Sequence, residues 1–181
     1  LLPAREMMED GRRSTVFAYP QIAIREAMAN ALIHQDFSVK GAGPLIEIFA
    51  DRIEMTNPGS PLVDVARIID NPPRSRNEKL AALMRRFHIC EESGTGWDKI
   101  IISCELQHLP APKIDVYEDN TKVTLYSTMD FSNMQMEDKL WACYMHACIR
   151  FVENKQMNNS SLRERFGLDN SYKSSVSRII K

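Results

Sequence analysis

The stretch REAMANALIHQDF, residues 25–37, places Glu26, Asn30 and His34 at intervals of four in an otherwise mostly apolar segment. At about 100° per residue, these side chains fall within a helical stripe roughly 80° wide. A solvent-exposed face is usually wider and more charged than this stripe. A carboxylate and an amide one turn apart on a mostly buried helix suit a cleft, where the amide oxygen can ligate a metal ion and the carboxylate can polarise water. An exposed ladder of hydrogen-bonded side chains is the alternative that the pattern leaves open.

Charge is distributed unevenly along the 181 residues. Residues 1–138 hold 15 Lys and Arg against 21 Asp and Glu, whereas residues 139–181 hold 8 against 3. The positive balance of +5 at the C-terminal end predicts a separate module with a polyanionic partner. There is no run of 18 apolar residues, so we expect a cytoplasmic protein without a membrane partner. The sequence begins without Met, and we expect it to be a piece of a longer chain.

The periodicity of the first 130 residues predicts an α+β fold with helices on one face of a sheet. Residues 1–19 show no clear periodicity, and Pro20 then opens a helix to about His34. Ser75 and Glu78 have the spacing of a capping box and predict the start of a second helix. Two hairpins are expected, the first formed by LIEIFA and RIEMT, and the second by KIDVYED and KVTLYST around Asn120.

Two glycine-containing turns follow the opening helix. The first, NPG at 57–59, ends the first hairpin, and a simple β-turn explains it when it is taken alone. The second, GTG at 94–96, stands immediately before a helix. It can be a glycine that ends the preceding helix, but a Gly-rich turn at a helix N-terminus also presents N–H groups and a positive dipole end to phosphate. Each signal is weak, and their order along the chain is much more specific.

Residues 20–126 resemble the C-terminal ATPase-like domain of the transcriptional regulators often labelled RecG-related, a branch of the GHKL superfamily. The resemblance is carried by YPQIAIREAMANALIHQDFS, IEIFADRIEMTNPGSP, SRNEKLAALMRRF and EESGTGWDKII. It implies a Bergerat (GHKL-like) two-layer α/β sandwich, with ATP or ADP and Mg²⁺ bound between the helices and one sheet face. A helicase motor would need a GxxxxGK[ST] loop, which the sequence lacks.

The resemblance also implies roles for individual residues. Glu26 matches the glutamate that prepares the attacking water and is the candidate catalytic residue, and Asn30 matches the asparagine that ligates Mg²⁺. His34 belongs to the pattern without an assigned role. Asn57 and Gly59 stand where the superfamily has the Asp and Gly of its first glycine box, at the adenine. Because Asn57 replaces the Asp, the bond that it accepts from the adenine amino group lacks charge assistance.

Gly94, Thr95 and Gly96 match the second glycine box, at the phosphates. The implied organisation is an N-terminal connecting segment (1–19), a GHKL-like ATP-binding domain (20–130), a linker (131–138) and a helix-turn-helix module (139–181).

The C-terminal module is expected to be a small helical unit that binds duplex DNA. A first helix carries one apolar side, formed by Leu140, Cys143, Tyr144, Ala147 and Phe151. Ser161 and Glu164 predict a capping box at the start of a second helix, which Gly167 closes, and SYKSSVSRIIK forms the third. The stretch CYMHACIRFVENKQMNNSSLRERFGL resembles the winged-helix tail of the same regulators, which here would stop at Lys181, where a wing begins. A helical packing or dimerisation module is the alternative.

The basic residues of this module supply the candidate DNA contacts. They cluster in the last two helices, at Arg163, Arg165, Lys173, Arg178 and Lys181. Lys173 and Ser177 are the candidates for base edges, because they lie near the start and middle of the helix expected in the major groove. Arg163 and Arg178 are the candidates for phosphate contacts.

Three functions are compatible with these features. The first is a DNA-binding transcriptional regulator whose GHKL-like domain senses or uses ATP. The second is a weak Mg²⁺-dependent ATPase that drives a conformational cycle. The third is a ligand-free pseudo-ATPase scaffold that forms a homodimer.

Overall fold

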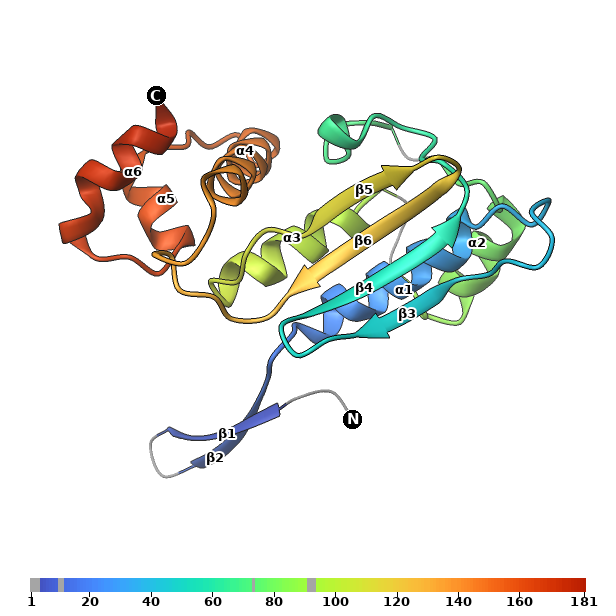
Figure 1. Ribbon diagram of the computed structural model, residues 1–181, viewed down its shortest axis with the longest axis horizontal. Helices are drawn as coiled ribbons and strands as arrows, with labels where there is room; N and C mark the ends of the chain where they lie inside the picture. The colour runs from blue at the N-terminus through green and yellow to red at the C-terminus, as the bar shows by residue number, and fades with distance from the viewer. Residues whose placement is uncertain (1–3, 10–11, 73, 91–93) are drawn as a thin grey trace.

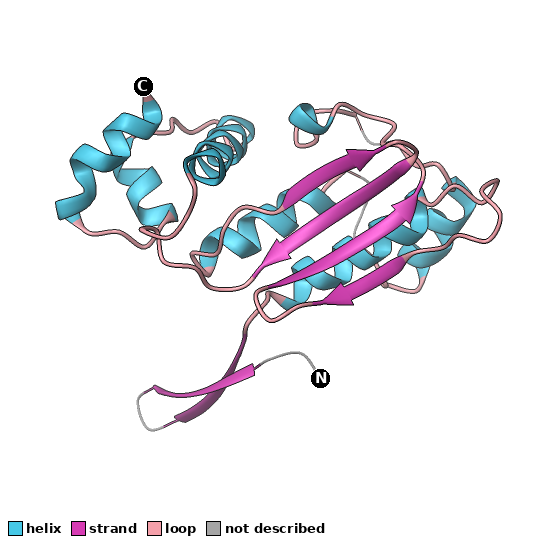
Figure 2. Ribbon diagram, viewed as in Figure 1, coloured by secondary structure: helices cyan, strands magenta, loops and turns pink. Residues whose placement is uncertain are grey.

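The computed structural model describes residues 4–9, 12–72, 74–90 and 94–181. The strands come in consecutive pairs separated by helices, and the chain after β6 is helical (Figure 2). The strands are β1 (Ala4–Glu9), β2 (Arg12–Phe17), β3 (Leu45–Ile48), β4 (Arg52–Pro58), β5 (Lys113–Tyr117) and β6 (Asn120–Tyr126). The helices are α1 (Gln21–His34), α2 (Glu78–Arg86), α3 (Gly96–Leu106), α4 (Met136–Val152), α5 (Asn159–Arg165) and α6 (Lys173–Ile180), with the short 3₁₀ helices η1 (Val65–Arg67) and η2 (Asn170–Tyr172).

A four-stranded antiparallel sheet in the order β3-β4-β6-β5 forms one layer of the molecule, and helices α1 and α3 cover one of its faces (Figure 1). In the central pair, Ile53 lies opposite Leu125 and Met55 opposite Val123. These four side chains are buried and form a core with residues of both helices. The α+β class predicted from the sequence is confirmed.

Helix α1 has the bounds that the sequence predicts. Pro20 is its N-cap, in an extended conformation, and the chain leaves the helix after His34 with Gln35 again extended. Ala23 and Ala27 have no exposed surface, and their small size lets α1 lie close to the sheet and to α3. The close packing of α1 against the sheet and α3 therefore fixes the positions of its polar side chains.

The two hairpins predicted from the sequence are β3-β4 and β5-β6. Pairing of β4 with β6 places Asn57 opposite Thr121, so the end of the first hairpin lies against the start of β6. A further hairpin, β1-β2, occupies the N-terminal segment for which the sequence showed no periodicity. It extends away from the four-stranded sheet (Figure 1).

The start of α2 differs from the prediction. Asn77 is the N-cap, and no side chain caps the helix, so the capping box of Ser75 and Glu78 is wrong. Residue Asn77 instead directs its side chain to the end of α1, because its Nδ2 donates to the carbonyl oxygens of Ile33 at 2.9 Å and Gln35 at 2.7 Å.

Helices α4, α5 and α6 form a second core beside the sandwich. Its buried members are Ala111, Met134, Ala142, Cys143, Leu162, Phe166, Val176 and Ile179. The predicted capping box at α5 is wrong by one turn: Asn158 is the N-cap and exchanges hydrogen bonds with Ser161, whereas Glu164 takes no part. Gly167 ends the helix at φ +65°, as expected.

The buried face of α4 also differs from the prediction. Leu140, Tyr144 and Phe151 are exposed. The buried residues are Ala142, Cys143, Met145, His146 and Ile149. Among the described residues, no helix is long and apolar enough to cross a bilayer.

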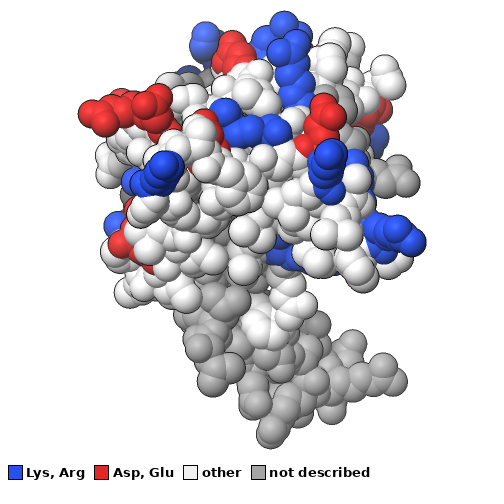
Figure 3. All heavy atoms as spheres, turned by 90° about the vertical axis from the view of Figure 1, so that its right-hand side faces the viewer, with Lys and Arg blue, Asp and Glu red and all other residues white. Residues whose placement is uncertain are grey.

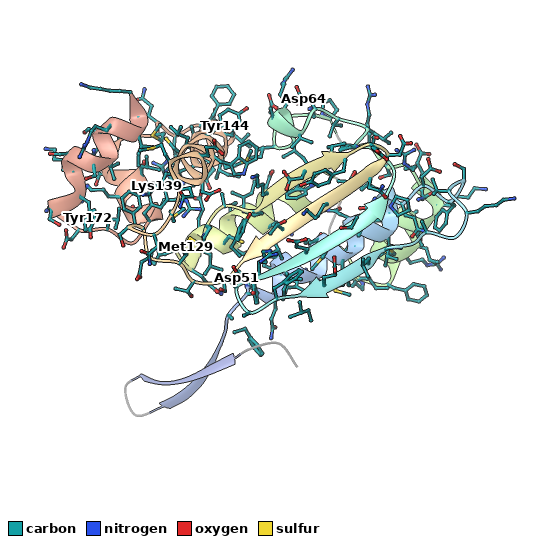
Figure 4. All side chains as sticks on the ribbon, in the orientation of Figure 1. Asp51, Asp64, Met129, Lys139, Tyr144 and Tyr172 are labelled. Carbon is teal, nitrogen blue, oxygen red and sulfur yellow. The ribbon has the colours of Figure 1, made fainter. Side chains whose placement is uncertain are left out.

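The helical module and the sandwich are joined by an apolar cluster and by polar contacts. Ile69 and Ile101 of the sandwich pack with Met145 and Ile149 of α4, and Ile68 borders this cluster. Tyr144 donates a hydrogen bond of 2.5 Å to the carbonyl oxygen of Ala66 in η1. Figure 4 shows Tyr144 beside the segment that begins at Asp64. The segment that contains η1 is therefore held by α4.

Candidate functional site

A cavity opens between α1, the β4-β6 pair, the segment 61–75, α2 and the beginning of α3. Of the residues predicted to bind nucleotide or to act in catalysis, those lining it are Glu26, Asn30, Asn57, Gly94 and Gly96. Gly59 and Thr95 are not among the lining residues. The structure thus brings residues from three separate parts of the sequence to one place.

Glu26 is the buried acid of the cavity, with 2% of its surface exposed. Its Oε1 lies 3.3 Å from Nη2 of Arg25, a neighbour that is largely exposed. A Cβ added to Gly96 would lie 3.2 Å from Oε2 of Glu26, so the first residue of α3 approaches this carboxylate closely. The N-terminus of a helix attracts negatively charged groups, so the start of α3 is a favourable neighbour for a carboxylate group.

Asn30 lies one turn after Glu26 in α1, and its side chain also lies close to Gly96. Its Nδ2 would be 3.7 Å from a Cβ on Gly96. This nitrogen is buried and has no hydrogen-bond partner within the described part of the chain. Buried polar atoms normally have partners, and a group bound in the cavity would supply one.

Asn57 and Gly59 differ in what they contact. Asn57 is 3% exposed, and its Nδ2 donates to the carbonyl oxygen of Pro58 at 3.2 Å. Gly59 has φ +110°, and a Cβ there would lie 3.2 Å from both Nε of Arg76 and the carbonyl oxygen of His34. Glycine is therefore required at position 59 for the turn itself. Thr95 is exposed and precedes α3 as its N-cap residue.

Arg76 holds this turn and was not identified from the sequence. Its Nε donates to the carbonyl oxygen of His34 at 3.1 Å, and its Nη2 donates to that of Ser60 at 2.7 Å. Its Nη1 lies 3.3 Å from Oδ2 of Asp36. Together with Asn77, it satisfies carbonyl groups at the end of α1 that have no partner within the helix. Arg76 and Asn77 lie within the stretch SRNE, which the sequence analysis interpreted only as a capping box.

His34 has two roles in the structure. Its carbonyl oxygen anchors Arg76, and the residue also lines the cavity. Burial lowers the pKa of His34, and the nearby Arg76 lowers it further. The imidazole is therefore neutral at pH 7.

The rest of the cavity combines apolar and basic side chains. Leu62, Ile68, Ile114 and Val123 supply apolar surface, and Trp97 also contributes to the lining. Arg74 and Arg85, neither of which the sequence analysis selected, are its arginines. This combination suits a ligand with a flat apolar part and a negatively charged part.

The candidate DNA-binding residues occupy different environments. Lys173 and Arg178 are exposed on α6. Ser177 accepts a hydrogen bond of 2.9 Å from Nδ2 of Asn159, and Nε of Arg163 donates to Oδ1 of the same asparagine at 3.0 Å. Asn159 thus ties Ser177 and Arg163 into the contact between α5 and α6.

Arg165, which the sequence placed in the basic cluster, is buried with 3% of its surface exposed. Its Nε lies 3.8 Å from Oε1 of Glu105 at the end of α3. The other carboxylate oxygen of Glu105 is 3.0 Å from Nδ1 of His146, whose Nε2 is 3.2 Å from Oγ of Ser161. Arg165 therefore belongs to a buried polar network between the sandwich and the helical module, and it is not available to DNA.

One protein family matches the central part of the chain. Residues 41–125, from the loop before β3 to β6, match the family described as "Putative ATP-dependent DNA helicase recG C-terminal". This segment is similar to a RecG-related ATPase-like domain. The match includes Asn57, Gly94 and Gly96 and begins after α1, so Glu26 and Asn30 lie outside the matched residues.

A solved structure resembles nearly the whole chain. The crystal structure of the DIP2311 protein from Corynebacterium diphtheriae superimposes with a TM-score of 0.64 and 18% sequence identity. The likeness covers 98% of this chain and 38% of that protein, so this chain corresponds to well under half of the length of DIP2311. At this identity, the likeness shows a shared fold. No curated protein matched the sequence.

Proposed function

We propose that this chain binds ATP or ADP together with Mg²⁺ in the cavity of its RecG-related ATPase-like domain. The observation that carries the proposal is the meeting of Glu26, Asn30, Asn57 and Gly96 around one cavity that also contains apolar and basic side chains. An adenine ring suits the apolar lining, and a phosphate chain suits the arginines and the glycine-rich approach to α3. The unpartnered amide of Asn30 fits a site that a ligand completes.

The residues of the cavity are suitable for Mg²⁺ held jointly with nucleotide. Mg²⁺ in such sites keeps several waters and takes one or two protein ligands plus phosphate oxygens. The described residues contain no group of three or more His, Cys, Asp or Glu that could hold a metal ion, and a nucleotide-linked Mg²⁺ does not need one. Oδ1 of Asn30 is the protein ligand proposed here.

Glu26 is proposed as the base that accepts a proton from the attacking water. Bound ATP would supply the phosphoanhydride bond that is broken. The carboxylate is well suited to this role because it is buried and held in place by Arg25 and by the N-terminus of α3. Gly96 allows that close approach, and Asn57 is proposed to accept the hydrogen bond from the adenine amino group.

Addition of ATP or ADP with Mg²⁺ is expected to raise the melting temperature of the chain. A ligand that binds only the native state stabilises it by about 2.7 kcal/mol at a hundredfold excess over its dissociation constant. Differential scanning fluorimetry with each nucleotide, with Mg²⁺ and with EDTA, measures the effect. An unchanged melting temperature at millimolar nucleotide would refute the proposed function and favour a ligand-free scaffold.

The variant Asn30→Ala tests the metal ligand within the same experiment. It should still respond to nucleotide, but the difference between Mg²⁺ and EDTA should disappear. Asn133→Ala, which removes an exposed asparagine outside the cavity, is the matched control and should behave like the native chain. Retention of the Mg²⁺ effect in Asn30→Ala would assign the metal to other ligands.

We further propose that the chain is part of a DNA-binding regulator, with α5 and α6 as a helix-turn-helix of a winged-helix-like module. The supporting observations are the charge balance of +5 over residues 139–181 and the exposure of Lys173, Arg178 and Lys181 on or beside α6. Nucleotide turnover distinguishes a regulator that only senses ATP from an ATPase that drives a conformational cycle.

Duplex DNA binding is expected to weaken steeply as salt rises. Each phosphate contact contributes a slope of about −0.9 in log affinity against log salt, so three to four contacts predict a slope of about −3 to −4. Because Arg165 is buried, it is not counted among these contacts. Gel-shift titrations at about 50 to 200 mM salt measure this slope, because DNA affinity changes strongly over that range.

Variants of exposed basic residues locate the DNA contacts. Arg178→Ala should flatten the slope by about one unit and weaken all sequences alike, and Lys173→Ala should also change the preferred sequence. Lys113→Ala, an exposed lysine on β5, is the control and should leave binding unchanged. Absence of binding, or binding insensitive to salt, would make the helices a packing module.

A further inference from the structure

We propose that Arg74 and Arg85 form a cationic pair that binds the phosphate chain and makes the cavity selective for nucleotides over nucleosides. The inference rests on the proposed function, because it specifies which part of the nucleotide the cavity recognises. Nothing in the sequence pattern assigned these residues a role, since phosphate recognition was attributed to the glycines at 94–96.

The two arginines reach the cavity from separate elements. Arg74 lies in the loop that precedes α2, and Arg85 is in the last turn of that helix. Within the described ranges, neither guanidinium group forms a hydrogen bond or an ion pair. Arg76, between them in sequence, has its guanidinium fully engaged with His34, Asp36 and Ser60. Arg76 therefore stabilises the fold, whereas the charges of Arg74 and Arg85 are available to bind a ligand.

The charges around the cavity favour an anion. Among the described residues that line the cavity, Glu26 is the acidic one, and it already lies near Arg25 and the N-terminus of α3. His34 is neutral at pH 7 because burial and Arg76 lower its pKa. Arg74 and Arg85 thus give the described part of the lining two positive charges against one negative charge, and a nucleoside would leave these arginines without a partner.

The surface at one end of the molecule carries charges of both signs (Figure 3). On the end of the molecule turned toward the viewer in Figure 3, Lys and Arg side chains lie among Asp and Glu side chains rather than in one continuous basic patch. A general attraction of polyanions to this end is therefore not expected. Recognition depends on the planar guanidinium groups, which bind phosphate oxygens in pairs and with defined geometry.

Helix α2 provides an internal control for this inference. Arg86 follows Arg85 directly, has the same charge and is exposed, but it does not line the cavity. Because both residues are arginines in the same helix, replacing either by alanine has nearly the same effect on net charge and helix propensity. Their side chains point about 100° apart around the helix axis, so only one of them reaches the cavity. Any difference between them measures the position of the guanidinium relative to the cavity.

The test is a titration of the full chain with ATP, ADP, AMP and adenosine, followed by calorimetry and by the fluorescence of Trp97, which lines the cavity. Native affinity should rise with the number of phosphates. Arg85→Ala and Arg74→Ala should each reduce ATP affinity by about tenfold to a hundredfold, the range for a hydrogen bond to a charged group, while adenosine affinity stays unchanged. Arg86→Ala should retain native affinity for all four ligands, and circular dichroism verifies folding of each variant.

The outcomes separate this inference from the proposed function. If adenosine binds as tightly as ATP, or if Arg85→Ala and Arg86→Ala lose equal affinity, the cationic pair is refuted while the nucleotide site remains. If no nucleotide and no adenosine binds, the proposed function fails, and this inference fails with it. Inorganic tripolyphosphate is the final probe: binding that Arg85→Ala weakens and Arg86→Ala retains supports the pair independently of the base.

Discussion

Replacing Glu105 by alanine is expected to lower the free energy of unfolding by about 3 to 5 kcal/mol, the range measured when one partner of a buried ion pair is removed. Glu105 stands between two buried groups, since its carboxylate lies 3.8 Å from Nε of Arg165 and 3.0 Å from Nδ1 of His146. All three guanidinium nitrogens of Arg165 are buried without a hydrogen-bond partner in the described structure. Burial lowers the pKa of Arg165, and the charge of Glu105 opposes that shift.

Urea denaturation followed by circular dichroism and by the fluorescence of Trp141 measures this loss. Trp141 is a suitable reporter because its Nε1 donates to the carbonyl oxygen of Pro112 across the same junction, at 2.8 Å. The double variant Glu105→Leu with Arg165→Leu should be less destabilised than Glu105→Ala, because removing both charges leaves neither one buried alone. Equal losses in the single and double variants would show that packing, rather than charge, is what Glu105 contributes.

The rate of ATP hydrolysis is expected to fall by about 10²- to 10⁴-fold in Glu26→Gln, the usual contribution of a general base. The amide keeps the shape of the buried side chain but cannot accept the proton of the water. Nucleotide affinity should change little, because a base acts mainly in the transition state. The native rate itself is expected to be slow.

Measurement of phosphate release at saturating ATP, beside calorimetric affinity, separates these effects. Glu47→Gln, which changes an exposed carboxylate on β3, is the control and should hydrolyse at the native rate. Hydrolysis that persists in Glu26→Gln would assign the base to another residue. Native protein that binds ATP without turnover would favour a sensor over an enzyme.

The parts of the fold that the sequence predicts best are those defined by local rules. Pro20 and the apolar character of the following residues were enough to give the bounds of α1, and alternation around Asn120 was enough for the β5-β6 hairpin. The buried face of α4 was predicted wrongly for a physical reason. Met145 and Ile149 pack against the sandwich while Ala142 and Cys143 pack against α5 and α6, so two partners share a helix whose exposed side is also partly apolar.

The candidate site was predictable to the extent that it depends on motifs. Glu26, Asn30, Asn57 and Gly96 were selected from their spacing and from a family resemblance, and the structure brings them to one cavity. Another part of its wall comes from described residues between 61 and 75, a stretch without a periodicity that would indicate a role. The roles of Arg74 and Arg76 depend on which carbonyl groups lie near each one, and this is a property of the folded chain alone.

Ile68 lines the cavity and also borders the apolar cluster to which α4 contributes Met145 and Ile149. A fragment cut at the limits of the family match, residues 41–125, would lack both α1 and α4. It would contain the glycine motifs but neither Glu26 nor the helix that supports the segment around Ile68. Affinities measured on such a fragment would describe a different cavity, so the smallest reliable unit for biochemistry extends from α1 through α4.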